Sequence, residues 1–509
     1  MYEAMLVLSV VIFIGVIVAY LREPSASIFH PLTFYLMFHG LVFVVRPIVA
    51  WHYEFDVVYR AMKFTPTLWD KTQALICTNL ALVVFSVVTL LLVREPFGFR
   101  QNDYDLIQRR MLTQRFLPVA VLLGAISIYS ILWLLDYQES GEGVSQLDLR
   151  TGARAMTATN GYFYAAGVLL TGIVAMIAFL GRFTLLSLAP FAVFAVFRFA
   201  TGQRGAVVTA AVMIALLYMF DRRQKWPTWP VIAAVVAIVP IFNAIQDDRG
   251  ARLRQSFGYE VAERYLTVES RDEKPLETID IAMMEMVEFL TWSIPERSGS
   301  YDYFLGNLQI LTEPIPRALW PDKPIGAPIK MFDLYTHAVT INGVMSVPGM
   351  GWMYWGYPGV AIWAAVFALI YGTGYKVFAR GRQSNLAVIA YMIFMSTAVV
   401  AYRDGLILTI LKQAFFYMAP LGLLILVCWA TKLPSVDNLR RLWTERNLAA
   451  EGLANDPRRR RRLSADANAA LARPSMPPID AAEAGPKARR RERALQAVIS
   501  AARPRNFRV

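Results

Sequence analysis

The chain has 509 residues but only two cysteines, Cys77 and Cys428, and both lie inside apolar stretches. Two such residues exclude a disulfide framework and a CxxC zinc knuckle, so neither cross-links nor structural zinc hold the fold. Charged residues are also scarce, at 17% against roughly 25% in a soluble domain. The sequence has no P-loop, no GxGxxG motif opening a helix after a strand and no HExxH motif. Nucleotide-driven transport and zinc proteolysis are therefore without support.

Hydrophobic residues make up 56% of the chain and are gathered into blocks long enough to cross a membrane. A helix needs about 20 largely apolar residues to cross a hydrocarbon core of about 30 Å. The sequence therefore predicts an all-α, polytopic integral membrane protein with about eleven transmembrane helices. The predicted spans are 4–21, 28–50, 72–93, 116–136, 161–180, 183–199, 206–220, 230–246, 349–371, 386–402 and 406–430.

The predicted chain has four parts. Residues 1–245 hold helices one to eight, residues 246–348 form a large periplasmic loop with an amphipathic helix, residues 349–430 hold helices nine to eleven, and residues 431–509 form a basic cytoplasmic tail that is largely disordered. Lysine and arginine concentrate in short cytoplasmic loops, and basic clusters here fall in alternate loops. The tail, with 18 Lys or Arg against 8 Asp or Glu, agrees with a cytoplasmic C-terminus. Because the tail follows a membrane helix, its arginine run is predicted to contact anionic lipid and not nucleic acid.

The large loop holds 16 acidic and 10 basic residues, so it is too charged to enter the bilayer and too long to be a turn. Residues 276–292 have a helical period, with Met283 and Leu290 on an apolar face and Glu277 and Glu288 on the opposite face. This pattern predicts an amphipathic helix over the mouth of the bundle. A plain structural cap is its favoured role.

The densest candidate site is a stretch with four prolines in the eleven residues 314–324. Prolines stiffen the backbone, so Arg317, Trp320, Asp322 and Lys323 are presented with little conformational freedom to lose on binding. Tryptophan stacks on sugar rings, while arginine and lysine bind phosphate oxygens. The stretch therefore predicts a sugar-phosphate site, and a rigid surface loop without a ligand is the alternative.

Charged residues at membrane depth are costly and are therefore site candidates. They are Arg46, Arg198, Arg204, Arg403, Asp404 and Lys412. Arg204 lies in the tight turn 201–205, and Arg403 and Asp404 lie in a similar turn between the last two spans. The simpler alternatives are that Arg403 and Asp404 neutralise each other and that the flexible stem of Lys412 reaches the interface.

Two further features lie beyond the proline-rich stretch. His337 is the only histidine in the large loop, and its neutral imidazole would accept a proton from a hydroxyl near pH 7. A lone histidine is more often structural. A glycine-rich entry with Trp352, Tyr354 and Trp355 leads into the ninth span, and an interfacial aromatic belt is the alternative to a site there.

These features together resemble the bacterial O-antigen and exopolysaccharide repeat-unit polymerases. The resemblance lies in the layout of eleven spans with one large outward loop, the turn carrying Arg204, the stretch 315–324 and the entry 349–359. It covers residues 28–433. The pattern Pro-Arg-x-x-Trp-Pro-x-Lys-Pro, which begins at Pro316, is the most specific part.

The resemblance implies an inverting, metal-independent glycosyl transfer at the periplasmic face of the bacterial inner membrane, with no cofactor. Donor and acceptor would be undecaprenyl-pyrophosphate-linked oligosaccharides, and a chain-length regulator is a further candidate partner. Arg204, Arg317 and Arg403 would surround the diphosphate leaving group and stabilise its growing negative charge. Asp322, His337 and Asp404 are the candidate bases. The substrate-binding candidates are Arg150, Arg154, Arg249, Arg297, Trp320, Lys323 and Tyr354.

Two other functions remain open. An O-antigen ligase would use similar donors and a loop histidine, for which His337 is available. A transporter or flippase for the lipid-linked glycan belongs to another class. Transporters tend to show internal repeats, and none is evident in this sequence.

Overall fold

The computed structural model describes residues 1–101, 104–139, 146–147, 154–155, 165–201, 204–229, 231–233, 251–256, 274–278, 281–316, 319–320, 322–324, 326–337 and 344–432. The chain divides into two compact units. The first contains residues 1–100 and 117–424, and the second contains residues 101–116 and 425–509. Both sides of the large predicted loop thus belong to the first unit. In the second unit, Arg115 Nε donates to Thr431 Oγ1 at 2.8 Å.

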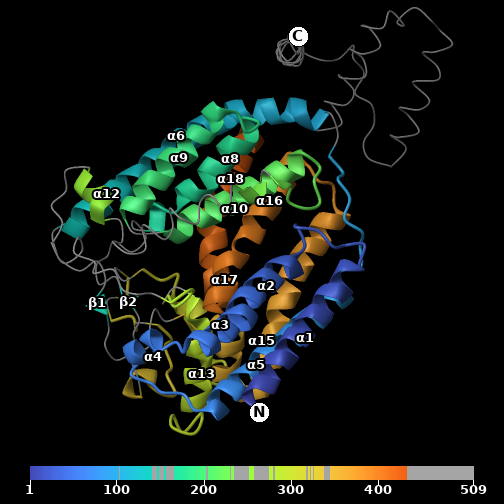
Figure 1. The fold of residues 1–509 in the computed structure, drawn as a ribbon. Coiled ribbons are helices and arrows are strands. Elements are labelled where there is room, and N and C mark those ends of the chain that lie inside the picture. Colours follow the sequence, from blue (N-terminus) through green and yellow to red (C-terminus); the bar gives the residue numbers. More distant parts are fainter. Residues whose placement is uncertain are drawn as a thin grey trace, which may run out of the picture. The chain divides into compact units, whose positions relative to one another are not determined.

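Helices dominate the described residues (Figure 1). The first part of the chain contains α1 (Tyr2–Leu21), α2 (Pro31–His39), the π-helix η1 (Gly40–Val45), α3 (Arg46–Tyr53), α4 (Val57–Met62), α5 (Leu68–Leu92) and α6 (Tyr104–Glu139). The middle part contains the paired antiparallel strands β1 (Gln146–Leu147) and β2 (Arg154–Ala155), then α8 (Leu169–Leu180), α9 (Leu185–Ala200), α10 (Arg204–Asp221) and α12 (Ala251–Ser256). The last part contains α13 (Met283–Ser293), η4 (Leu305–Leu308), α14 (Gln309–Thr312), η5 (Leu334–Thr336), α15 (Ser346–Arg380), α16 (Asn385–Ser396), α17 (Ala398–Asp404) and α18 (Ile407–Ala430).

Eight of the described helical segments are long and apolar enough to cross a membrane. They are Tyr2–Leu21, Pro31–Tyr53, Leu68–Leu92, Gln108–Leu135, Arg204–Asp221, Ser346–Arg380, Asn385–Asp404 and Ile407–Ala430. The prediction of an all-helical, multi-pass membrane protein is confirmed. Two shorter apolar helices, α8 and α9, lie where the fifth and sixth spans were predicted. The predicted span 230–246 lies mostly outside the described residues, so the count of eleven stays a prediction, as does the disorder of the tail.

α1, α5 and α15 pack side by side in the first unit (Figure 1). α5 starts with a capping box, in which Asp70 N donates to Thr67 Oγ1 at 3.2 Å and Thr67 N donates to Asp70 Oδ2 at 2.8 Å. α1 exposes a row of side chains at helical spacing, Val7, Val11, Ile14 and Val18. Such an apolar stripe on a span of this length is a lipid-facing surface.

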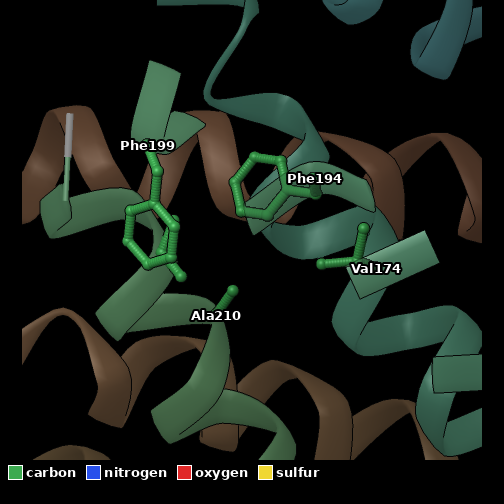
Figure 2. Close-up of a cluster of buried hydrophobic side chains, with 5 residues drawn as sticks. Val174, Phe194, Phe199 and Ala210 are labelled. Atoms are coloured by element: carbon green, nitrogen blue, oxygen red, sulfur yellow. The ribbon is translucent and has the colours of Figure 1, made fainter. Parts of the chain in front are cut away.

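A separate apolar core joins α8, α9 and α10. Val174 of α8, Phe194 and Phe199 of α9, and Ala210 of α10 converge in this core (Figure 2), together with Val207. These side chains are all buried. The core therefore holds the short helices α8 and α9 against the longer helix α10.

α15 is interrupted by a reversal of the chain. Trp355 (φ −165°, ψ 40°) and Gly356 (φ 57°, ψ −142°) have non-helical backbone angles. A Cβ placed on Gly351 would lie 2.6 Å from the Cα of Val360. In a straight helix, residues nine positions apart are separated by about 13 Å. The close approach therefore shows that residues 346–354 fold back against the rest of the helix.

The reversal corrects the predicted ninth span, 349–371. The segment after the reversal, residues 357–380, has a helical length of about 36 Å, enough to cross a membrane alone. The folded-back segment begins beside the turn between α17 and α18. There a side chain on Gly405, whose φ is +71°, would collide with the carbonyl oxygen of Ser346. Trp363 Nε1 donates to the Gly405 carbonyl at 2.7 Å.

The predicted amphipathic helix is shorter and more buried than expected. α13 begins at Met283 and not near residue 276, and both its faces are inside the protein. Glu285 and Glu288 are as buried as Met283 and Leu290. The polar face of α13 does not meet water, because it packs against charged and hydroxyl groups of α3 and α4.

Candidate functional site

The first of two charged groups in the first unit lies at one end of the helices. This end carries the N-terminus of α1, α4 and α13 (Figure 1), and Tyr2 there packs on Trp51 with ring centroids 5.1 Å apart. We call it the loop end, because the described residues 294–337 follow α13 there.

The first group is a sealed ion pair between α3 and α13. The Arg46 Nε donates to both carboxylate oxygens of Glu285 at 3.0 Å, and its Nη2 lies 2.8 Å from Glu285 Oε1. Arg46 also donates to the carbonyl of Leu276. The Arg46 side chain is 0% exposed and that of Glu285 is 2% exposed. Geometry of this kind is required to offset the desolvation of two buried charges, and it fixes α13 to the membrane helices.

The other acidic residues of the predicted polar face are also used internally. Glu288 accepts a hydrogen bond from the Tyr59 hydroxyl at 2.7 Å. Burial raises the pKa of Glu288 to about 8, although the positive charge of Lys71 acts in the opposite direction. Glu277 accepts from the backbone N–H groups of Asp56 and Val57 at 2.6 and 2.7 Å, so it caps α4 from a distant part of the chain.

The second group is built around one carboxylate. Glu313, which follows α14, forms an ion pair with the Lys412 ammonium on α18. Lys323 Nζ lies 3.9 Å from Glu313 Oε2, and Gln309 Nε2 donates to the same oxygen at 3.2 Å. Burial alone would raise the pKa of Glu313, but the hydrogen bond and charge of Lys412, with Gln309 and Lys323, lower it overall. We call Gln309, Glu313, Lys323 and Lys412 the Lys412 group.

Arg403 and Asp404 end α17, and Thr409 links Asp404 to α18. Arg403 Nε is 3.9 Å from Asp404 Oδ1, and Thr409 Oγ1 donates to Asp404 Oδ2 at 3.1 Å. Thr409 and Lys412 are three residues apart on one helix, so their side chains are neighbours. Asp404 and the Lys412 group therefore occupy consecutive turns, and the Arg403 and Lys412 side chains remain 36% and 47% exposed.

The reversal of α15 positions the loop that carries Glu313. The backbone N–H groups of Asp302 and Tyr303 donate to the carbonyls of Met353 and Tyr354, each at 3.0 Å. Phe304 then stacks on the Tyr354 ring with centroids 4.8 Å apart. Asp302 accepts from Gly306 N at 2.8 Å, and burial raises the pKa of Asp302. The loop is thus fixed only ten residues before Glu313.

Tyr354, a predicted substrate-binding residue, is buried beside the reversal of α15. Its side chain is 0% exposed and packs edge-on against Trp363, with centroids 4.8 Å apart. In this structure it supports the loop and is not available to contact a substrate. Arg297 stacks over Trp292 at 3.8 Å and lies 4.0 Å from Glu296, and these contacts belong to the end of α13.

The predicted cluster of three arginines is not assembled by the contacts of the described residues. Arg204 begins α10, which packs mainly on α8, α9 and α16, whereas Arg403 ends α17, which packs mainly on α2 and α15. Arg317, Arg150 and Arg249 lie outside the described residues. Arg154 lies in β2, where the structure describes its backbone but not its side chain. The cations that share a partner are Lys323 and Lys412, both paired with Glu313, while Arg403 lies beside Asp404.

The three candidate bases have different surroundings. Asp404 is beside Arg403 and Thr409. Asp322 is exposed in a turn directly before Lys323, and Trp320 in the same turn is also exposed. His337 follows η5 and is half buried. Among the contacts of the described residues, none links His337 to the Lys412 group. In the same residues, no three His, Cys, Asp or Glu side chains gather in a way that would hold a metal ion.

Sequence reasoning missed Glu313, the carboxylate that organises the site. A signal was present, because a lysine near the start of a membrane span requires a counter-charge and Glu313 stands immediately before the proline-rich stretch. The partner lies 99 residues away along the chain, however, and no local pattern identifies it.

No protein-family model, no curated protein and no solved structure matches this chain.

Proposed function

We propose that this protein is a metal-independent, inverting glycosyltransferase that polymerises undecaprenyl-pyrophosphate-linked oligosaccharide repeat units at the periplasmic face of the bacterial inner membrane. The observation that supports the proposal is that Lys323 and Lys412 pair with Glu313, while Arg403 lies beside Asp404, which Thr409 links to α18 one turn before Lys412. In this proposal the loop end faces the periplasm.

The charges of this site suit a diphosphate leaving group. Three cations, Lys323, Lys412 and Arg403, face two carboxylates, Glu313 and Asp404, which leaves one net positive charge. Negative charge grows on the diphosphate as the glycosidic bond breaks, and cations stabilise that charge more in the transition state than in the ground state. Lys412 has three donors and is about half exposed, so it has donors left for a phosphate oxygen while it holds Glu313.

Asp404 is the base that this arrangement favours. Thr409 holds its Oδ2, which leaves Oδ1 directed toward the neighbouring cation. In the proposed step, Asp404 takes the proton of the acceptor hydroxyl as that oxygen attacks the anomeric carbon of the donor. The bond from that carbon to the diphosphate oxygen breaks, and the diphosphate keeps the bonding electrons.

The test uses purified full-length protein in lipid vesicles with the lipid-linked repeat unit, and mass analysis of the products. Wild type should give glycans lengthened by whole repeat units. We expect Lys412→Ala, Arg403→Ala and Asp404→Asn each to lose more than 90% of that product, since a single charge of this type is worth roughly 10²-fold or more in rate. Arg60→Ala, which removes an exposed arginine of α4, should retain activity. No lengthened product from wild type, or full activity in all three variants, would contradict the proposal.

A transporter for the lipid-linked glycan is the second candidate, and the broken helix α15 is the observation that favours it. Transporter helices break near the middle of the membrane. Here the segment after the break is long enough to cross by itself, which puts the break at the loop end and favours the enzyme. Movement of labelled lipid-linked sugar across vesicles, without any lengthening, would decide for transport.

The O-antigen ligase remains the related enzyme, in which a finished glycan moves to a different acceptor. The polymerase and the ligase differ in the acceptor that receives the glycan. A ligase would attach glycan to a lipid A core and would leave repeat units unjoined in the vesicle assay, and it would depend on His337. His337→Ala should therefore leave polymer length unchanged if the polymerase proposal is right.

A further inference from the structure

The loop that carries the Lys412 group exposes large apolar side chains to an unusual degree. Leu311 and Leu319 are 72% and 79% exposed, which equals or exceeds the exposure of Leu91 (61%) and Phe415 (68%) on the lipid-facing surfaces of α5 and α18. We call the described part of residues 303–331 the apolar loop segment. Its exposed large apolar residues are Tyr303, Leu311, Ile315, Leu319, Trp320, Ile329 and Met331.

The depth of this segment is fixed by its contacts with membrane helices. Glu313 is paired with Lys412, the sixth residue of α18, so Glu313 lies level with the first turns of that span. A lysine stem extends about 6 Å, which keeps the pair within one or two turns of the helix start. Leu311, two residues earlier, is therefore near the boundary between headgroups and acyl chains. Leu411 next to Lys412 is itself exposed on the lipid-facing side.

The start of the segment is anchored at the reversal of α15. Tyr303 is bonded to the backbone of Tyr354, beside the reversal of α15, and the neighbouring Trp355 is exposed. Tyrosine and tryptophan are the residues that occupy membrane interfaces. The segment also carries exposed Lys330, which suits lipid phosphates. The segment is thus anchored to membrane helices both at Tyr303 and at Glu313.

We propose that the apolar loop segment inserts Leu311 and Leu319 into the acyl boundary of the leaflet at the loop end, with phospholipid as its partner. The segment is an interfacial element of the membrane domain and not a loop in water. If the two leucines stayed in the aqueous phase, their apolar surface would remain in contact with water. Insertion into the adjacent leaflet removes that surface from water. The inference stands on exposure and anchoring, so it holds whether or not the protein is a glycosyltransferase.

Spin-label accessibility tests this inference. Both native cysteines are buried and are replaced in Cys77→Ala/Cys428→Ala. Leu311→Cys and Leu319→Cys are each made in that background, labelled with a nitroxide and reconstituted in vesicles of phosphatidylcholine and phosphatidylglycerol. Oxygen, which concentrates in acyl chains, is compared with a water-soluble nickel chelate as relaxing agent. Leu91→Cys gives the lipid reference, and Glu296→Cys, at an exposed position after α13, gives the water reference.

We expect the oxygen-to-nickel ratio at both leucine positions to be at least fivefold above that at Glu296→Cys and close to that at Leu91→Cys. A ratio equal to the water reference at either position overturns the proposal and would leave the surface available for a protein partner. Ile315→Cys replaces either variant that fails to accumulate, with the same expected ratio and the same criterion.

Discussion

The ion pair between Arg46 and Glu285 gives the sharpest test of how the fold is held. Arg46→Met keeps the length and most of the volume of the side chain but removes its charge and donors. Glu285 would then be a carboxylate buried among α3, α5 and α13 without its partner, and the carbonyl of Leu276 would lose its donor. The same argument holds in the other direction for Glu285→Met.

The magnitude follows from the complete burial of the pair. Breaking a buried ion pair by removing one partner costs about 3–5 kcal/mol, because the remaining charge is uncompensated. Removing both partners in Arg46→Met/Glu285→Met leaves no charge to desolvate and should return the protein to within about 1 kcal/mol of wild type, apart from the lost bond to Leu276. The pair should thus show a coupling free energy of about 3 kcal/mol or more.

Arg60 provides the matched control at the same end of the molecule. Its pair with Asp56 has a similar distance, 3.0 Å, but both side chains are exposed. Arg60→Ala should therefore change the free energy of unfolding by less than about 1 kcal/mol.

The assay is unfolding of the purified variants in mixed micelles, with increasing SDS, followed by circular dichroism. Both single variants should unfold at clearly lower SDS than wild type, and the double variant should recover most of the loss. Single variants as stable as Arg60→Ala, or a double variant no better than the worse single one, would refute the reasoning.

Two further variants probe the interior of the same unit. Glu288 keeps its proton more tightly in the folded protein than an ordinary glutamate, so the free energy of unfolding should fall as pH rises from about 4.5 to 8. The Glu288→Gln side chain stays neutral and still accepts a hydrogen bond from Tyr59. This variant should therefore show a flatter dependence of stability on pH, measured by melting curves at several pH values. Gly405→Ala should lower the melting temperature and cost roughly 2 kcal/mol or more, because the methyl group meets the Ser346 carbonyl at a positive φ, whereas Gly422→Ala, where the space is open, should be neutral.

The membrane helices could be predicted because crossing a bilayer is a local property. α1, α5 and α18 match the predicted spans within a few residues at each end. Each spanning helix must make its backbone hydrogen bonds within itself and present apolar side chains to the lipid, and both requirements can be recognised from its own sequence. The reversal in α15 is not local in that sense. The sequence predicted a glycine-rich entry into one span, whereas the reversal depends on the close packing of Gly351 against Val360.

The candidate site shows the same division between local and distant causes. Arg403 and Lys412 could be identified from the sequence because a charge near a span is costly wherever it occurs. Lys323 could be identified because it lies in the stiff stretch with four prolines. Their contacts could not be predicted, since Glu313 and Lys412 are separated by 99 residues. The partner of Glu285 on the polar face of α13 could not be identified for the same reason, because Arg46 lies 239 residues before it.

Exposure separates the roles of the two charged groups, although both pair basic side chains with glutamate. A ligand anion can bind only where it exchanges with, or adds to, the existing partners. For Arg46 such an exchange would leave Glu285 buried and unpaired, which costs more than a phosphate contact returns. Glu313 loses much less on release, because its side chain and that of Lys412 are partly in solvent. Exchange of an ion-pair partner for an anion therefore costs less at the Lys412 group than at Arg46. The Arg46 pair instead holds α13, and with it the start of the loop, against the membrane helices.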